Sequence, residues 1–329
     1  MFRNIVRNFG PAVDVVDGEE YRPPVPGPAQ VSVRMSLASI NPSDLITISG
    51  AYASRTPLPF VPGFEGVGVV ESVGADVPDL SVGQRVLPLG STGAWQDVKV
   101  TDGRWCFPVR PELTDEQAAT AYINPLTALL MVRRYAPSGA APVAVNAAAS
   151  AIGRMIIQLL NDAGQRPIAL VRNPRSRALL ADVELAAVVC TTEIRPHADL
   201  RATLLEITGG EGLATAWDAV GGAEGADLYR ALSPGGTLVH YGLLSGRPLP
   251  PLLSAERADA RLVMFRLRDW VHTAARSALA DALADVYQRV LDGTAASTVA
   301  AVYPLTQVRD ALRLHAAPDR RGKVLLRPN

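Results

Sequence analysis

The sequence predicts an α/β protein in which a β domain is joined to a domain with a doubly wound parallel sheet. Two observations lead to this prediction. Short, glycine-bounded stretches of alternating apolar residues fill the first third of the chain, whereas strand-like and helix-like stretches alternate from residue 142 onward. Regular alternation of strands and helices implies right-handed crossovers and hence a parallel sheet.

The predicted β domain rests on three short segments. "VSVRMSL" (31–37) alternates apolar with polar residues, which is the period of a half-buried strand, and "GVGVVESVG" (66–74) and "GQRVLPLG" (83–90) are bounded by glycine. Prolines are dense at 23–28 and 57–62, which marks loops between such strands. These features predict a compact β domain with irregular connections.

The character of the sequence changes near residue 113, where helical signals begin. Thr114 and Gln117 have the spacing of a capping box, and Asn124 followed by Pro125 is predicted to cap a second helix. Strand-like segments then alternate with helical ones; they are "PVAVN", "PIALV", "AAVVCT", "ATAWDAV", "GTLVHYG" and "RLVMFRL".

A further helix is predicted at about 274–292, and the final "GKVLLRP" is predicted to be a strand that returns to the first domain. We therefore predict a substrate-binding, catalytic β domain made of residues 1–118 and 271–329. The dinucleotide-binding domain is predicted at 119–270.

Composition limits the classes of function. The 329 residues suggest two domains at ~150 residues each, and equal numbers of acidic and basic residues argue against nucleic acid or an anionic membrane as partner. The two cysteines, Cys106 and Cys190, exclude a disulfide framework and a four-cysteine zinc site. No stretch approaches ~18 uninterrupted apolar residues, so we expect a cytoplasmic protein.

The stretch "VNAAASAIGRMII" (145–157) lies where a dinucleotide fold needs a tight turn of small residues between its first strand and helix. Ala149, Ser150 and Ala151 are small, and Gly153 would let the helix pack closely on the strand. Only one glycine of the usual fingerprint remains. An ordinary strand-to-helix turn in an alanine-rich protein is therefore the alternative interpretation.

The end of the predicted second strand favours NADPH over NADH as cofactor. NAD enzymes place an acidic residue there, but this chain reads "ALVRNPRSR", with Arg172, Arg175 and Arg177 and no Asp or Glu. Guanidinium groups match the 2′-phosphate of NADPH. A solvated basic helix start is the alternative, although cations are disfavoured at a helix N-terminus unless an anion joins them.

Several motifs together resemble the zinc-free branch of the medium-chain dehydrogenase/reductase superfamily. Those typical of the superfamily are "PFVPGFEGVGVV", "VGQRV", "NAAASAIG", "LVRNP", "GGTLVHYG" and "GKVLL". "INPSD" followed by "SGAY", with "INPLTA", is most similar to 2-enoyl thioester reductases of the mitochondrial trans-2-enoyl-CoA reductase type. The resemblance implies a chaperonin-10-like β domain, a Rossmann domain and a homodimer.

The resemblance also implies the site residues. Zinc-containing members carry a cysteine and a histidine where Asn41 and Phe64 stand, so no metal is expected. Tyr52 matches the catalytic tyrosine, which would also contact the substrate. The residues implied to bind the cofactor are Asn41, Asn124, Ala149, Ser150, Ala151, Ile152, Gly153, Arg172, Asn173, Arg175, Tyr241, Gly242, Leu243 and Lys323.

The implied reaction sends a hydride to the β carbon of an enoyl thioester, and negative charge then develops on the thioester oxygen. A tyrosine hydroxyl can donate a hydrogen bond to such an oxygen, so Tyr52 could polarise the carbonyl, orient the substrate or relay a proton. Packing of Tyr52 on a loop is the alternative. Phe265 and Trp270 could line the acyl pocket, and core packing is the alternative for both.

Three functions remain open on the sequence. The first is NADPH-dependent reduction of the C=C bond of a 2-enoyl thioester or similar conjugated carbonyl. The second is an NADPH:quinone oxidoreductase, whose reaction depends less on a proton-donating residue. The third is a non-catalytic relative that binds NADPH or RNA, against which the zero net charge and the lack of a basic stripe argue. The expected partners are a small-molecule or thioester substrate and a second copy of the chain.

Overall fold

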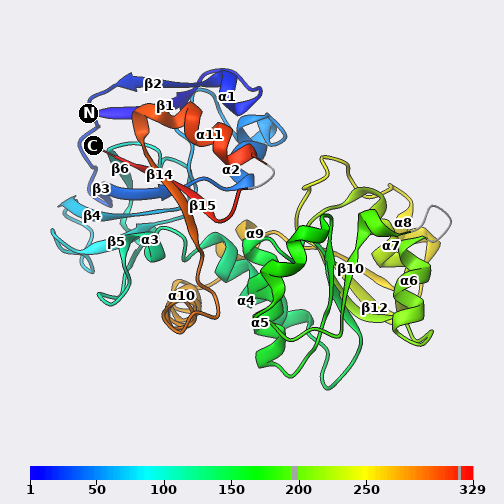
Figure 1. The fold of residues 1–329 in the computed structure, drawn as a ribbon. Coiled ribbons are helices and arrows are strands. Elements are labelled where there is room, and N and C mark those ends of the chain that lie inside the picture. Colours follow the sequence, from blue (N-terminus) through cyan, green and yellow to red (C-terminus); the bar gives the residue numbers. More distant parts are fainter. Residues whose placement is uncertain (195–198, 318–319, 329) are drawn as a thin grey trace. The chain divides into compact units, whose positions relative to one another are not determined.

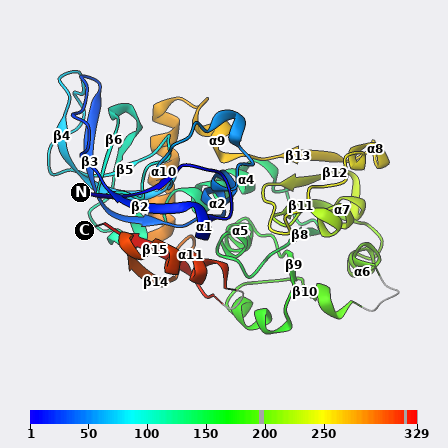
Figure 2. The same ribbon diagram turned by 90° about the horizontal axis from the view of Figure 1, so that it is seen from above.

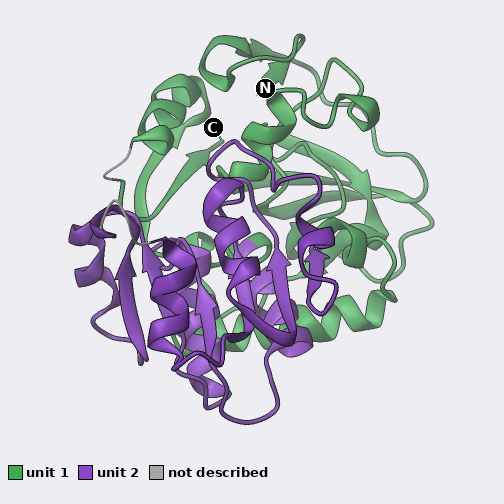
Figure 3. Cartoon of the chain, turned by 90° about the vertical axis from the view of Figure 1, so that its right-hand side faces the viewer, with its two compact units in different colours: residues 1–123, 268–329 green, residues 124–267 purple. Residues whose placement is uncertain are grey.

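The computed structural model describes residues 1–194, 199–317 and 320–328 (Figure 1). The chain forms two compact units (Figure 3): unit 1 comprises Met1–Ile123 and Arg268–Asn329, and unit 2 comprises Asn124–Leu267. The sequence-based boundaries after residues 118 and 270 lie within a few residues of these.

Unit 1 is built on a seven-stranded sheet in the order β14-β15-β3-β4-β5-β7, with β6 paired to β3, and a separate hairpin of β1 and β2. Its strands are β1 Phe2–Val6, β2 Val16–Glu20, β3 Gln30–Ser39, β4 Gly66–Val73, β5 Arg85–Pro88, β6 Val98–Asp102, β7 Cys106–Pro108, β14 Val299–Pro304 and β15 Lys323–Arg327. Its helices are α1 Ala12–Val15, α2 Pro42–Ile48, α3 Asp115–Ala118, α10 Arg276–Leu291 and α11 Val308–Ala316, with short 3-10 turns η1 Ala53–Arg55, η2 Gly103–Trp105 and η5 Leu305–Gln307.

The last strand of the chain completes the first sheet, as the sequence predicted. β15 pairs antiparallel with β3 and parallel with β14, so segments from both ends of the chain lie side by side (Figure 1). Val33 on β3, Val70 on β4 and Leu326 on β15 are fully or almost fully buried and share one apolar core with Trp95. The hairpin of β1 and β2 was not predicted, because its residues lack a regular alternation of apolar and polar side chains.

Unit 2 contains a six-stranded parallel sheet in the order β10-β9-β8-β11-β12-β13, whose strands lie side by side in Figure 2. The strands are β8 Val143–Val145, β9 Ile168–Val171, β10 Ala187–Cys190, β11 Leu213–Asp218, β12 Leu232–His240 and β13 Arg261–Met264. This order is that of the doubly wound dinucleotide-binding fold, in which the strand order reverses beside the first strand. The predicted fold class is therefore confirmed, with the reversal between β8 and β11.

The helices of unit 2 are α4 Ile123–Tyr135, α5 Ala151–Asp162, α6 Leu200–Ile207, α7 Gly222–Arg230 and α8 Leu253–Glu256, with 3-10 turns η3 Pro174–Leu180 and η4 Thr191–Glu193. α9 Leu267–Val271 connects unit 2 to the second part of unit 1. Buried side chains of the strands, such as Leu170 and Leu238, share a core with Tyr229 of α7.

Two details of the predicted helices were wrong. α4 begins at Ile123, so Asn124 lies inside its first turn and does not precede it as a cap. The segment after β9 forms the seven-residue 3-10 helix η3 and not an α-helix. Its start is set by Asn173, whose side-chain oxygen accepts a hydrogen bond from the backbone N–H of Arg175 at 3.0 Å.

Among the residues that the structure describes, none of the helices combines the length and the apolar character needed to cross a membrane.

Candidate active site

The turn between β8 and α5 is closely packed at the N-terminus of the helix. The side chain of Ser150 caps α5 by accepting a hydrogen bond from the N–H of Gly153 at 3.1 Å. A Cβ atom on Gly153 would lie 2.5 Å from the carbonyl oxygen of Ala147, so only glycine allows the helix to pack this closely on the turn. Ala147 itself adopts a positive φ of 45°. Ala149, Ala151 and Ile152 complete this small-residue turn at the N-terminus of the helix.

Three polar side chains tie together the ends of the strands next to this turn. Asp218, at the end of β11, accepts hydrogen bonds from the Asn146 amide at 2.6 Å and from the backbone N–H groups of Val220 and Gly221 at 2.9 and 3.0 Å. His240, at the end of β12, contacts the other Asp218 oxygen through Nδ1 at 2.6 Å. The carboxyl ends of β8, β11 and β12 are therefore held in one fixed arrangement, at the edge of the sheet where such folds bind their ligands.

The segment after β12 contains three of the predicted cofactor residues. The N–H of Tyr241 donates to the carbonyl of Asp218 at 2.9 Å, and a Cβ atom on Gly242 would lie 2.7 Å from the carbonyl oxygen of Ala219. The buried Tyr241 hydroxyl has no hydrogen-bond partner among the described residues, and burial raises its pKa. Leu243 is partly exposed, and Phe265 is buried, with its N–H bonded to the carbonyl of His240.

The arginines after β9 differ in their partners. Arg177 is held by Glu193 through two hydrogen bonds. Arg172 and Arg175 are exposed, and neither has an acidic partner among the described residues. Burial and the nearby Asp218 raise the pKa of Glu224 to about 7, while the Arg172 charge opposes that rise. A pair of unneutralised guanidinium groups thus follows the second strand of the sheet, where a 2′-phosphate would be bound.

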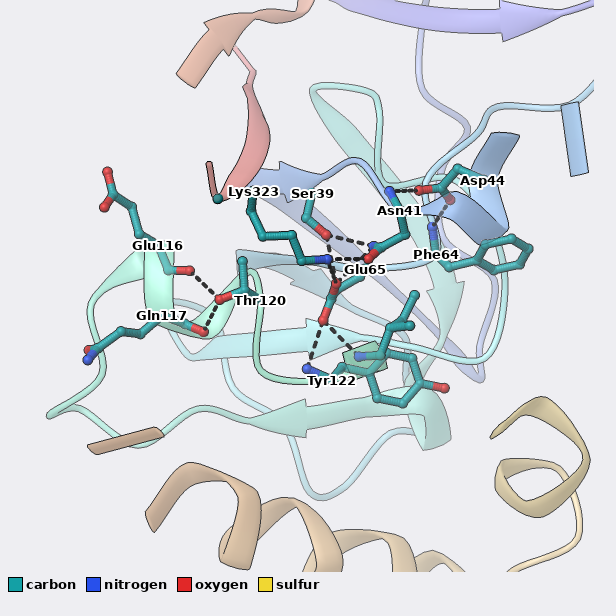
Figure 4. Close-up of polar contacts among 12 residues, drawn as sticks. Ser39, Asn41, Asp44, Phe64, Glu65, Glu116, Gln117, Thr120, Tyr122 and Lys323 are labelled. Atoms are coloured by element: carbon teal, nitrogen blue, oxygen red, sulfur yellow. Dashed lines mark hydrogen bonds and ion pairs between the residues drawn. The ribbon is translucent and has the colours of Figure 1, made fainter. Parts of the chain in front are cut away.

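In unit 1, the buried carboxylate of Glu65 gathers four hydrogen bonds (Figure 4). One oxygen accepts from the Ser39 hydroxyl at 2.6 Å and the Asn41 amide at 2.9 Å. The other accepts from the backbone N–H groups of Tyr122 and Ile123, both at 2.8 Å. The side chain therefore joins the end of β3 to the point where the chain leaves unit 1.

Lys323, the first residue of β15, supplies the positive charge for this carboxylate. Its ammonium group lies 3.9 Å from Glu65 and donates a hydrogen bond to the Asn41 side-chain oxygen. Burial lowers the pKa of Lys323, and Glu65 and Asp44 oppose that effect. Both Asn41 and Lys323 were predicted to contact the cofactor; the structure places both in this buried network.

The Asn41 amide uses both of its polar atoms within the network, and the Phe64 ring points away from the Glu65 carboxylate (Figure 4). The part of the chain that the structure describes has no cluster of three or more His, Cys, Asp or Glu side chains suited to hold a metal.

Asp44 is a second buried carboxyl group close to this network. Its oxygens accept hydrogen bonds from the N–H of Asn41 at 2.8 Å, at the start of α2, and from the N–H of Phe64 at 3.0 Å. Burial raises its pKa to about 7, although the two backbone hydrogen bonds and Lys323 act in the opposite direction. Asp44 thus completes the capping box at the start of α2, and the same side chain fixes the loop that carries Phe64.

Tyr52 lies on the loop between α2 and η1 and is half-buried. The guanidinium group of Arg55 stacks over its ring at 4.0 Å from the centroid, so a positive charge accompanies the predicted catalytic phenol. Trp270, the other predicted substrate residue besides Phe265, is half-buried in α9, and Asn124 is half-buried in α4.

Comparison with known proteins identifies the family. Residues 27–111 match the alcohol dehydrogenase GroES-like domain, and residues 192–326 match the zinc-binding dehydrogenase family. A solved structure of a Bacillus thuringiensis protein, described as a putative NADPH:quinone reductase, is 34% identical, covers 99% of this chain and 98% of that one, and has a TM-score of 0.92. The chain belongs to the zinc-free branch of the medium-chain dehydrogenase/reductase superfamily.

Other known proteins are also similar to this chain. The mitochondrial enoyl acyl-carrier-protein reductase of Arabidopsis thaliana is 34% identical over 246 residues, which span 73% of this chain and 65% of the plant protein. The match thus covers slightly less than two thirds of that relative. A mycobacterial protein solved with NADPH is 25% identical, with full coverage of both chains and a TM-score of 0.87. The chain is accordingly an oxidoreductase of this superfamily.

Sequence reasoning missed Asn146 and Asp218 as organisers of the reductase's strand ends. Both are polar residues that follow directly on apolar strands, in "VAVN" and "ATAWD", and that signal was available. The role of Glu65 as a structural hub was also missed, because its partners at 39, 41, 122, 123 and 323 come together only in the fold.

We expect Glu65→Gln to destabilise unit 1 by about 3–5 kcal/mol, because an amide places a donor against groups that already donate and leaves Lys323 without its anion. Equilibrium unfolding in denaturant measures this change. Lys323→Met in the Glu65→Gln background should restore part of the loss. The exposed pair of Glu71 with Arg34 provides the control, since Glu71→Gln should cost less than about 1 kcal/mol. A Glu65→Gln loss no larger than that of Glu71→Gln would contradict the assigned role.

The raised pKa of Asp44 predicts a pH-dependent contribution to stability. Between the unfolded value of ~3.9 and the folded value of about 7, the folded state holds a proton that the unfolded state has released, so stability falls as pH rises through this window. Asp44→Asn does not titrate. Its deficit relative to the parent should therefore shrink between pH 4 and pH 7 by about 1.4 kcal/mol per unit of pKa difference. Denaturant unfolding at pH 4.5, 6 and 7.5 measures it, and a deficit that is constant or grows with pH would refute the shift.

Proposed function

We propose that this chain catalyses the NADPH-dependent reduction of the C=C bond of a 2-enoyl thioester, or of a similar conjugated carbonyl compound, without zinc. The observation that carries the choice of substrate is the 34% identity to the Arabidopsis enoyl acyl-carrier-protein reductase. The half-buried Tyr52 with its stacked guanidinium group supports it, because this pair offers a hydrogen-bond donor next to a positive charge.

The residues of unit 2 fit NADPH. The close packing at Gly153 leaves the N-terminus of α5 open to a pyrophosphate, and the unneutralised Arg172 and Arg175 suit a 2′-phosphate. The unpartnered Tyr241 hydroxyl lies after β12, at the edge of the sheet where the nicotinamide half would bind. When bound, NADPH supplies the hydride.

The protein's own contribution to the reaction is to meet the charge that develops on the substrate. Hydride addition at the β carbon moves negative charge onto the thioester oxygen, and the α carbon then needs a proton. We propose that the Tyr52 hydroxyl donates a hydrogen bond to that oxygen, which contributes about 3 kcal/mol in comparable sites. The Arg55 guanidinium group, stacked over the ring, adds a positive charge next to the proposed donor.

The reaction is proposed to proceed without zinc because the place of a metal is taken by other groups. Asn41 stands at the position of a zinc-ligating cysteine, and its side-chain oxygen accepts from Lys323. The Lys323 ammonium group next to Glu65 already supplies positive charge there, so a divalent cation would be repelled.

Quinone reduction is the second candidate, supported by the similarity to the Bacillus thuringiensis structure described as a putative NADPH:quinone reductase. We further propose, from the resemblance to the family, that the active form is a homodimer in the cytoplasm.

Arg172→Ala should weaken NADPH binding by about tenfold or more and leave NADH binding nearly unchanged, because only NADPH carries the 2′-phosphate. Arg177→Ala is the matched control. Arg177 lies in η3 of the same basic segment but is already paired with Glu193, so its loss should have little effect on the binding of either cofactor. Titration of each cofactor by fluorescence or calorimetry measures the affinities. Equal losses for NADPH and NADH would remove the argument for a phosphate site.

Tyr52→Phe should lower kcat for a short enoyl-CoA by about 10²–10³-fold and largely spare turnover of a benzoquinone. The rate of NADPH oxidation measures both activities; the substrates offered are a short and a long enoyl-CoA, a simple enone and benzoquinone. Tyr303→Phe, a half-buried tyrosine of β14, controls for general effects of removing a hydroxyl. Turnover of quinone with no activity on either thioester would overturn the proposed substrate.

A further inference from the structure

Unit 1 contains a pocket that none of the predicted catalytic or cofactor residues lines. It has a volume of about 370 Å³ and lies where η2 and β7 meet the segment that leads into α10. Trp105, Phe107, Val271 and Leu279 contribute apolar and aromatic surface, and Arg104, His272 and Arg276 contribute polar groups. Pockets of this size hold small ligands in other proteins.

Aromatic rings form one side of the pocket. The Trp105 and His272 rings lie with their centroids 5.0 Å apart at an angle of 58°. Phe107 and Leu279 are almost fully buried and give the pocket an apolar base. Gly90 packs against one face of the Trp105 indole, so a flat, aromatic ligand would contact the part of this half-buried ring that remains exposed beside His272.

Two guanidinium groups add positive charge to this aromatic surface. Arg276 lies over the Phe107 ring at 4.8 Å and donates one hydrogen bond to the carbonyl of Cys106 at 3.2 Å. Its face is thus fixed by the ring, while its remaining N–H groups are available to an anion. Arg104 lies over the Trp105 ring at 5.8 Å and pairs with Asp102 at 3.2 Å.

The surroundings of His272 also favour an anion. Burial lowers the pKa of this imidazole, and the charges of Arg268 and Arg104 lower it further, against a smaller opposite effect of Asp269. α10, with 16 residues, begins at Arg276 without a side-chain cap, so the N–H groups of its first turn add partial positive charge at the pocket.

We propose that this pocket binds a nucleotide, with its aromatic base against Trp105 and a ribose-linked phosphate on Arg276. Two sources supply that chemistry. One is the nucleotide end of coenzyme A in a thioester substrate, which rests on the proposed function, and the other is a free adenine nucleotide. The Rossmann unit binds NADPH by separate residues, so the pocket is a second nucleotide site on the chain.

The binding test uses the full chain with NADPH at saturation, so that the Rossmann site is filled. AMP and 3′,5′-ADP are titrated by calorimetry, and one saturable site per chain is expected. Arg276→Ala and Trp105→Ala should each weaken binding at least tenfold. Arg309→Ala, an exposed arginine of α11 paired with Asp17, should leave the affinity unchanged. Unchanged melting temperatures show that the variants fold. Arg276→Lys keeps the positive charge but loses the paired N–H donors of the guanidinium group, so it should bind the nucleotides with intermediate affinity.

A kinetic comparison then separates the two sources. The same short enoyl group is offered on coenzyme A and on pantetheine, which lacks the nucleotide. A KM at least tenfold higher in Arg276→Ala for the coenzyme A thioester alone, with kcat unchanged, identifies the substrate's nucleotide as the occupant. If Arg276→Ala leaves both KM values unchanged but still loses nucleotide binding in the calorimetry, the natural occupant of the pocket is a free nucleotide. Failure of both thioesters to react would refute the proposed function but leave the calorimetry valid. The pocket proposal is overturned if neither nucleotide binds, or if both bind equally well to the Arg276 and Trp105 variants.

Discussion

Unit 1 depends on the pairing of one buried anion with one buried cation. The Glu65 carboxylate can be buried because four N–H and O–H donors and the Lys323 ammonium group offset its loss of hydration. Those donors come from the end of β3, from the segment that leaves the unit and from β15. One charge therefore links three parts of the chain that are distant in sequence.

Unit 2 also contains a buried carboxylate that links separate parts of the chain. Asp218 is satisfied by an amide, an imidazole and two backbone N–H groups, and these contacts hold the ends of three parallel strands in register. A fixed strand edge of this kind suits the proposed hydride transfer, because that reaction requires the donor and acceptor carbons to be held in a defined geometry.

The parts that could be predicted from the sequence were those set by local pattern. The alternating strand at 31–37, the alternation of strands and helices, and the capping box at Thr114 each depend on neighbouring residues, and all appear in the structure. The Glu65 network could not be predicted, because members such as Asn41 and Lys323 lie 282 positions apart along the chain. The partner of Arg177 was hidden for a similar reason: a run of basic residues reveals cations but not which anions the fold brings to them.

The discontinuous make-up of unit 1 has a consequence for biosynthesis. Domains generally fold as they emerge from the ribosome, the N-terminal one first. Here β15, which lies between β14 and β3, is translated only after all of unit 2, whose residues are contiguous. β4 and β6 pair with β3 before unit 2 is made, but Ala38 and Ser39 at the end of β3 lack their β15 partners throughout translation of the second unit. Unpaired strand segments of this kind are prone to associate with other chains. Unit 2 can therefore complete its fold before unit 1, whose sheet is complete only after β15 has been translated.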